Sequence, residues 1–242
     1  MKFKFICCEV FTREACIAIA RSPHIVDPEF TPKGAHEKPD YLRNLIQEKI
    51  DAADKAADYD YILLGFGLCG NATAGLKARS IPLVIPRAHD CCTIFLGSRS
   101  KFIEHFGNNL SAEWSSAGYM ERGDSYIRDT DTGKLLGLDR EFEDLVEQYG
   151  EENAIYIWET LHPDFNSNEL IYINTPETSH LGYIDKFRQM AESEGKSLRI
   201  IEGDMRLINN MVMGEWNEDE YLIVPPGKEI KPVYDMEKVV DV

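Results

Sequence analysis

The stretch Asp60-Tyr-Ile-Leu-Leu-Gly-Phe-Gly-Leu-Cys-Gly-Asn-Ala-Thr-Ala-Gly75 indicates how the whole chain folds. Its apolar run from Tyr61 to Leu64 is typical of a buried strand, and a second such run follows from Pro82 to Ile85. Glycines and an alanine-rich segment able to form a helix lie between the two runs. Strands that alternate with helices in this way predict a parallel α/β sheet.

The same alternation occurs on both sides of residues 107–138. We therefore expect an α/β protein with two Rossmann-like parallel-sheet halves packed around a cleft. Residues 1–106 would form the N-terminal half, 107–168 an irregular and helical connection, and 169–242 the C-terminal α/β half. Strands are expected at 3–8, 25–26, 61–64, 82–85, 169–174, 197–201 and 221–224, with 27–39 as a loop. Helices are expected at 12–20, 40–57, a short segment ending near 78, 91–106 with a break near 97, 139–149, 154–161, 182–194 and 205–213.

Composition excludes several classes of protein. Of 242 residues, 43% are hydrophobic, which is typical of a packed globular chain. The formal net charge of -16 repels polyphosphate and anionic lipid surfaces, so nucleic-acid and membrane partners are not expected. There is no apolar run of the ~18 residues that a membrane helix needs, and no signal-peptide pattern. We expect a cytoplasmic protein with reduced thiols that acts on a small-molecule substrate.

Residues capable of chemistry follow the ends of several predicted strands. Cys8, Cys69 and the pair His89 and Cys91 do so in the first half, and Asp204 does so in the second. In open α/β sheets ligands bind outside the carboxyl ends of the strands. These side chains are therefore expected to share one edge of the fold.

Thiolates and an imidazole at one site together favour binding of a metal ion. Cys8, Cys69, His89 and Cys91 would be the ligands, with zinc as the preferred ion and an iron–sulfur cluster held by the cysteines as the alternative. Without a metal, a carboxylate at Asp90 could orient His89 as a base that activates a thiol. Asp90 and Asp204 are thus the catalytic candidates, although Asp204 could instead cap the next helix. The remaining cysteines are expected to be small buried hydrophobes, namely Cys7, Cys16 and Cys92.

The glycine turn has two interpretations. Gly65, Gly67 and Gly70, followed by Asn71, match the pattern of a dinucleotide-binding loop between a strand and a helix. The cysteine inside the turn is unusual for that use. A tight turn with a cofactor or metal close to its backbone is the preferred interpretation.

Several motifs together resemble the DUF1638 family of prokaryotic proteins. They are Gly67-Leu-Cys-Gly70, Pro86-Arg-Ala-His-Asp-Cys91 with Gly97, Glu202-Gly-Asp204, Gly214-Glu-Trp216 and Val224-Pro-Pro-Gly227. The family has no assigned activity, and its members tend to occur beside corrinoid-dependent methylamine methyltransferase systems. The resemblance implies a role in one-carbon metabolism, with a corrinoid protein or a methyltransferase as partner. A metal-dependent methyl- or thiol-group transferase is the activity that this context implies.

A looser likeness leads to a second hypothesis. The stretch Cys69-Gly-Asn-Ala-Thr-Ala74 is similar to the cysteine-containing stretch of the aspartate/glutamate racemase superfamily. A glycine intervenes here, and the later half of the chain has no second cysteine. The alternatives to a metal–thiolate protein are therefore a metal-free racemase- or lyase-like enzyme and a non-catalytic accessory protein of a methyltransferase system.

Overall fold

The computed structural model describes residues 1–107, 112–123, 146, 150–151, 168–233 and 238–242. The helices expected at 139–149 and 154–161 lie almost entirely outside these residues. Within the described part of the chain, no helix has both the length and the apolar character needed to cross a membrane.

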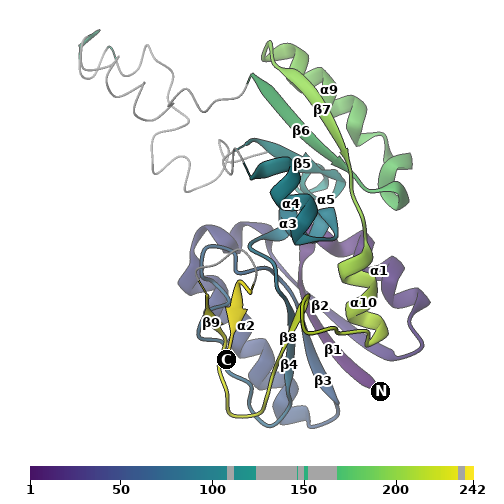
Figure 1. Ribbon diagram of the computed structural model, residues 1–242, viewed down its shortest axis with the longest axis vertical. Coiled ribbons are helices and arrows are strands. Elements are labelled where there is room, and N and C mark those ends of the chain that lie inside the picture. Colours follow the sequence, from purple (N-terminus) through teal and green to yellow (C-terminus); the bar gives the residue numbers. More distant parts are fainter. Residues whose placement is uncertain (108–111, 124–145, 147–149, 152–167, 234–237) are drawn as a thin grey trace.

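Two sheets, one mostly and one wholly parallel, organise the molecule, and they lie one above the other in Figure 1. The larger sheet has the strand order β2-β1-β3-β4-β8 and the smaller one β5-β6-β7. The first sheet contains β1 (Lys2–Cys8), β2 (Ile25–Thr31), β3 (Tyr61–Gly65), β4 (Leu83–Pro86) and β8 (Tyr221–Val224). The second contains β5 (Trp114–Ser116), β6 (Glu169–Asn174) and β7 (Ser197–Glu202), and a separate small ribbon joins β9 (Lys231–Pro232) to β10 (Val240–Asp241). The predicted α/β class with two sheet-containing halves is confirmed.

All strand pairs in the two sheets are parallel except one. Strand β8 runs antiparallel to β4, with Leu83 opposite Val224. It lies far along the chain and yet completes the edge of the first sheet. The larger sheet is therefore parallel except at this edge.

Helices cover both faces of the larger sheet (Figure 1). The α-helices are α1 (Thr12–Arg21), α2 (Pro39–Ala56), α3 (Cys91–Leu96), α4 (Arg99–Phe106), α5 (Ala117–Glu121), α9 (Tyr183–Ser193) and α10 (Arg206–Met213). Short 3-10 helices are η1 (Glu9–Phe11), η2 (Lys33–Glu37) and η4 (Pro176–Leu181). Helix α2 buries Leu42, Ile46 and Ile50, whose spacing places them on one helical face, against one side of the sheet. Helices α1 and α10 pack together over the other side.

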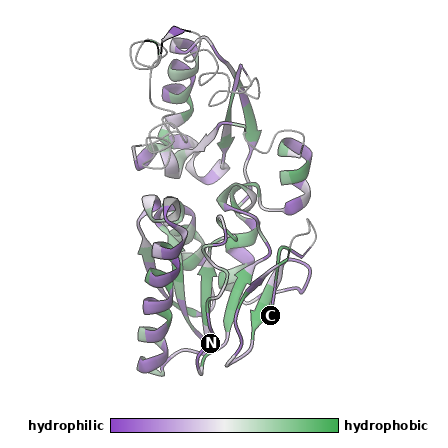
Figure 2. Ribbon diagram, turned by 90° about the vertical axis from the view of Figure 1, so that its left-hand side faces the viewer, coloured by the Kyte–Doolittle hydropathy of each residue, from purple (hydrophilic) through white to green (hydrophobic). Residues whose placement is uncertain are grey.

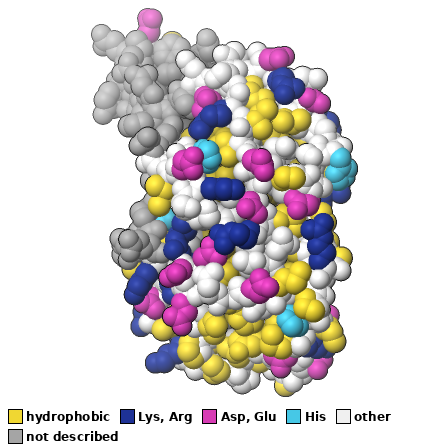
Figure 3. All heavy atoms as spheres, turned by 45° about the vertical axis from the view of Figure 1, so that its right-hand side comes forward, with side chains coloured by type: hydrophobic (Ala, Val, Ile, Leu, Met, Phe, Trp, Pro, Cys, Tyr) yellow, Lys and Arg dark blue, Asp and Glu magenta, His cyan; other side chains and the backbone are white. Residues whose placement is uncertain are grey.

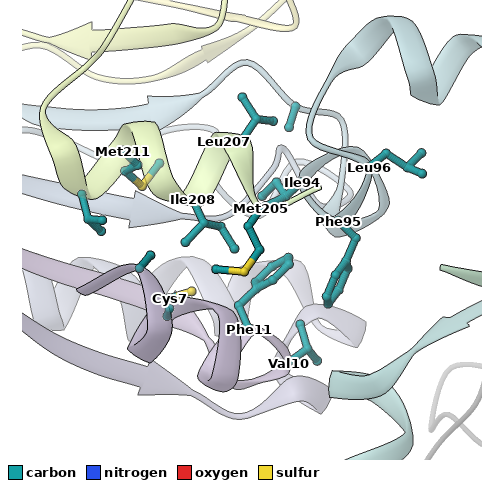
Figure 4. Close-up of a cluster of buried hydrophobic side chains, with 14 of the residues drawn as sticks. Cys7, Val10, Phe11, Ile94, Phe95, Leu96, Met205, Leu207, Ile208 and Met211 are labelled. Atoms are coloured by element: carbon teal, nitrogen blue, oxygen red, sulfur yellow. The ribbon is translucent and has the colours of Figure 1, made fainter. Parts of the chain in front are cut away.

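Apolar residues fill the sheets and the space between them. In Figure 2 the hydrophobic colouring concentrates on the strands of the larger sheet. One cluster extends from Phe5 and Leu63 of the first sheet to Ile173 of the second. At the junction, the rings of Phe11 and Phe95 lie 4.4 Å apart, with Met205 of the same cluster beside them (Figure 4). The two sheets therefore share a continuous hydrophobic core.

Two local predictions are wrong. The loop expected at 27–39 instead continues β2 to Thr31 and then forms η2. No helix follows the glycine turn, because the segment before Ala78 forms successive turns. Residues 107–138, for which no individual elements are predicted, contain β5, which pairs with β6, and α5. In each case pairing with a distant strand or packing against another element overrides the local propensity.

Candidate functional site

The site is built at a topological switch point of the larger sheet. From β1 the chain crosses to β2 on one side, whereas β3 lies on the other side of β1. Between the carboxyl ends of two such strands the connections diverge and leave room for a ligand. Cys8 is the last residue of β1, and Cys69 follows β3. Cys91 follows the neighbouring strand β4 as the first residue of α3.

Backbone hydrogen bonds hold the segments after β3 and β4 together. The amides of Leu68 and Cys69 donate to the carbonyls of Ala88 and His89 at 2.8 and 2.9 Å. Gly67 permits this approach, because a Cβ there would lie 2.6 Å from the backbone nitrogen of Asp90. The glycine turn is therefore a packing device that places Cys69 beside the segment carrying Cys91. It leads into turns rather than a helix, so the dinucleotide interpretation loses the helix N-terminus on which it depends.

Cys69 has an uncommon backbone conformation. Its φ is +47°, and the next two residues, Gly70 and Asn71, have φ of +62° and +69°. A left-handed conformation at a non-glycine residue costs roughly 1–2 kcal/mol. The turn is closed by Thr73, whose buried hydroxyl donates to the carbonyl of Gly67 at 3.1 Å. Backbone strain of this kind is more frequent at functional positions, where the surrounding structure maintains it.

Asp90 sets the start of α3. Its Oδ1 accepts a hydrogen bond from the amide of Thr93 at 3.1 Å, which is the geometry of an N-cap. Burial raises the pKa of this carboxyl, and the helix-capping hydrogen bond opposes that shift. Asp90 thereby positions Cys91 as the first helical residue.

Tyr119 of α5 completes the cluster. Its hydroxyl lies 2.7 Å from the Sγ of Cys91. Helix α5 can approach η1 this closely because residue 118 is a glycine, since a Cβ at Gly118 would overlap the carbonyl of Val10. Gly118 therefore allows the hydroxyl of Tyr119, which follows a strand of the smaller sheet, to contact Cys91, which follows a strand of the larger sheet.

The three thiols at the strand ends influence one another electrostatically. Burial raises the pKa of Cys8 to about 11 and of Cys69 to about 12. The pKa of Cys91 lies well above its ordinary value, mainly through burial, then through the charges of Asp90 and Cys69. Cys8 further raises the pKa of both other thiols. A charge on one of these thiols therefore disfavours ionisation of its neighbours.

A buried cation lies beside this cluster. The Nζ of Lys33 is 6.0 Å from the centre of the Tyr119 ring, and the residue is only 6% exposed. Its charge lowers the pKa of Cys8, against the larger opposing effect of burial. Lys33 therefore favours negative charge at the thiols.

His89 and Asp204 lie elsewhere. The ring of His89 faces Phe102 at 6.2 Å, and its buried Nε2 has no hydrogen-bond partner in the described part of the chain. Asp204 accepts a hydrogen bond from the amide of Arg206 at 2.8 Å just before α10, whose N-cap residue is Met205, and it pairs with Lys101 at 3.7 Å. The structure therefore brings together Cys8, Cys69 and Cys91 from the predicted residues, with His89 adjacent in sequence but turned toward α4.

The side chains as they stand do not form a metal-ligand set. Among the described residues, no group of three or more His, Cys, Asp and Glu side chains has the geometry to hold a metal ion. All six cysteines are free thiols. Cys8, Cys69 and Cys91 are partly accessible, whereas Cys7 and Cys92 are buried and Cys16 is exposed. The expectation of burial is thus confirmed for Cys7 and Cys92 and is wrong for Cys16.

Tyr119 and Lys33 are not among the predicted site residues. Tyr119 lies in the connection expected to be irregular and helical, and Lys33 lies in a segment expected to be a loop. The only local signal was the small residue Gly118 before the tyrosine. That signal becomes meaningful only when the neighbouring carbonyl of Val10 is known.

Comparison with protein-family models identifies the family of this chain. A family model described as "Protein of unknown function (DUF1638)" matches residues 30–212. The chain belongs to the DUF1638 family. The matched range of this DUF1638 protein includes Cys69, Cys91 and Tyr119, while Cys8 lies before it. Searches of curated proteins and of solved structures gave no match.

Proposed function

We propose that this DUF1638 protein is a metal–thiolate protein that binds zinc or an iron–sulfur cluster through Cys8, Cys69 and Cys91. The observation that carries the proposal is the placement of three partly accessible thiols at the carboxyl ends of the neighbouring strands β1, β3 and β4. Like charges so close together cannot all ionise in water-poor surroundings. A bound cation removes that obstacle, because metal binding deprotonates coordinating thiols.

The donor set fits a soft metal. Thiolate sulfur is the preferred ligand of zinc and of iron–sulfur clusters. Three thiolates around a divalent ion leave one negative charge, which the ammonium of Lys33 would offset. The unpartnered Nε2 of His89 would become a further donor only if its ring turned from α4 toward the thiols. Binding would require the Sγ atoms to converge further than they do here.

Methyl- or thiol-group transfer is the reaction class we propose for this site, as part of one-carbon metabolism served by a corrinoid protein or methyltransferase. A metal with three protein ligands keeps an open position, which can bind a substrate thiol and favour its thiolate. Tyr119 is placed to donate a hydrogen bond to the thiolate of Cys91, since its hydroxyl lies 2.7 Å from that sulfur. The ammonium of Lys33 would stabilise negative charge on the substrate.

A metal-free cysteine enzyme is the weaker candidate. Its nucleophile would need a pKa lowered toward neutrality. Burial instead raises the pKa of Cys8 to about 11 and of Cys69 to about 12. The contact between Cys91 and Tyr119 favours this candidate, because the hydroxyl stabilises a thiolate. That single hydrogen bond is outweighed by burial.

Elemental analysis of anaerobically purified protein tests the proposal. We expect about one equivalent of zinc, or several of iron, and a loss to less than about a tenth in Cys69→Ser and Cys91→Ser. Cys16→Ser is the matched control, because Cys16 is exposed and outside the cluster. A wild-type protein with no bound metal after incubation with zinc and with iron and sulfide would disprove the proposal.

A further inference from the structure

A cavity lies apart from the thiol cluster, between the segment after β4 and the starts of α4 and α10. Its volume is about 580 Å³, and its lining includes three arginines, Arg87, Arg99 and Arg206. We call it the arginine pocket. The chain carries a formal net charge of -16, and charges of both signs are interspersed over the face drawn in Figure 3. Three arginines around one cavity are therefore a local departure from the acidic character of the chain.

Two of the arginines are fixed by the fold. Arg206 is held by the carboxylate of Glu220 and donates from Nη2 to the carbonyl of Gly97 at 2.8 Å. Arg87 donates to the main-chain carbonyls of Glu218 and Lys238 at 2.8 and 3.0 Å. These guanidinium groups are thereby held in one orientation before any ligand arrives.

Arg99 differs from the other two. It donates from Nη1 to the carbonyl of Arg87 at 3.3 Å, and no carboxylate of the described residues forms an ion pair with it. Glu220 of the same pocket is already bound by Arg206 and by the amide of Asn217. Asp219 is exposed to solvent. Arg99 helps to lower the pKa of Glu220, yet that carboxylate is already bound by Arg206, so Arg99 is the arginine of the pocket without a direct ion pair among the described residues.

We propose that the arginine pocket binds a phosphorylated small molecule. A guanidinium presents a planar fork of donors that matches the oxygens of a phosphate. The side chains of Ser98 and Ser100, which also line the cavity, can add hydroxyl donors. The volume falls within the range of small-molecule sites and exceeds what a single inorganic ion needs. This inference does not depend on metal at the thiols.

Calorimetric titration with pyrophosphate at constant ionic strength tests the site, with succinate and chloride as comparison anions. We expect saturable binding of pyrophosphate that is tighter than that of either comparison anion. Arg99→Gln should weaken it by about tenfold or more, because a charge-assisted hydrogen bond is lost. Asp219→Asn should tighten it, since a nearby repelling charge is removed. That opposite direction cannot result from misfolding.

Arg79→Gln is the matched control, because Arg79 is exposed and paired with Asp51 at 2.8 Å away from the pocket. It should bind pyrophosphate as the wild type does. The proposal is overturned if pyrophosphate does not bind, if succinate binds equally well, or if Arg99→Gln binds like the wild type. Metal content measured on the same samples keeps this outcome separate from that of the thiol site.

Discussion

The hydroxyl of Tyr119 lies 2.7 Å from the Sγ of Cys91, although the two residues come from different halves of the fold. The thiol follows a strand of the larger sheet, and the phenol belongs to the helix after the first strand of the smaller one. The contact therefore connects the proposed metal site with the packing of the two sheets.

Tyr119→Phe should slow alkylation of Cys91 in metal-free protein. The hydrogen bond from the hydroxyl lowers the pKa of Cys91, so its removal leaves less thiolate at a given pH. We expect a rate about tenfold lower. Mass spectrometry after timed treatment with iodoacetamide measures it. Tyr183→Phe is the control, since that hydroxyl contacts Glu121 at 3.5 Å instead. Equal rates in wild type and Tyr119→Phe would contradict the role given to the phenol.

Lys33→Met should weaken metal binding and slow alkylation of Cys8. The ammonium lowers the pKa of Cys8, and methionine keeps a similar side-chain length without the charge. We expect about a tenfold change in each quantity, which corresponds to one charged interaction. Chelator competition and thiol labelling measure the two effects. Lys33→Arg keeps the charge and should restore much of both; a similar loss in Lys33→Arg and Lys33→Met would assign the lysine a packing role.

Gly67→Ala should destabilise the fold by about 1–3 kcal/mol, because a Cβ forces the turn away from the neighbouring segment. The nearest atom would be the backbone nitrogen of Asp90 at 2.6 Å. Urea denaturation measures the free energy of unfolding. For comparison, a Cβ at Gly227 meets nothing within 4 Å, so Gly227→Ala costs only its left-handed backbone. Equal stability of Gly67→Ala and wild type would mean that the two segments separate without cost.

Glu14→Gln should stabilise the protein at about pH 8 and have little effect at about pH 4. The side chain is 2% exposed, and neither carboxylate oxygen has a hydrogen-bond partner among the described residues. Burial raises its pKa from 4.5 to about 7. Between pH 4.5 and about 7, Glu14 ionises in the unfolded chain while it stays protonated in the folded protein. The free energy of unfolding therefore falls by about 3 kcal/mol over this interval. The neutral glutamine avoids that loss.

Urea denaturation at both pH values checks the effect of Glu14→Gln, with the exposed Glu48→Gln as control. The control should follow the wild type at each pH. A stability difference between Glu14→Gln and wild type that does not grow with pH would show that Glu14 ionises normally.

Several elements of the first half of the fold could be predicted from local patterns. The apolar runs at Tyr61 and Pro82 became β3 and β4, and the cysteines after them share one edge. Periodicity located α2 because its buried residues recur at helical spacing. The tight turn expected at the glycines is present, and at Gly67 a Cβ would collide with the backbone of Asp90; its predicted closeness to a cofactor or metal stays a prediction.

Interactions between distant segments could not be predicted. Strand β8 has an ordinary apolar pattern, and nothing in Tyr221–Val224 indicates that it pairs with β4. The contact of Tyr119 with Cys91 depends on helix α5, whose position is set by a carbonyl far away in sequence. His89 has the chemistry of a ligand, but its ring orientation follows from packing against Phe102. Local sequence patterns do not indicate which distant residues a side chain or strand will contact.

The late return of β8 has a consequence for synthesis on the ribosome. Strands β1 to β4 emerge well before Tyr221–Val224, so the edge of β4 stays open while the second sheet is being made. An open edge can pair with other nascent chains. Helix α10, which precedes β8, packs on α1 and lies over the same sheet. Early chaperone contact with that edge would therefore protect the growing polypeptide until its own closing strand arrives.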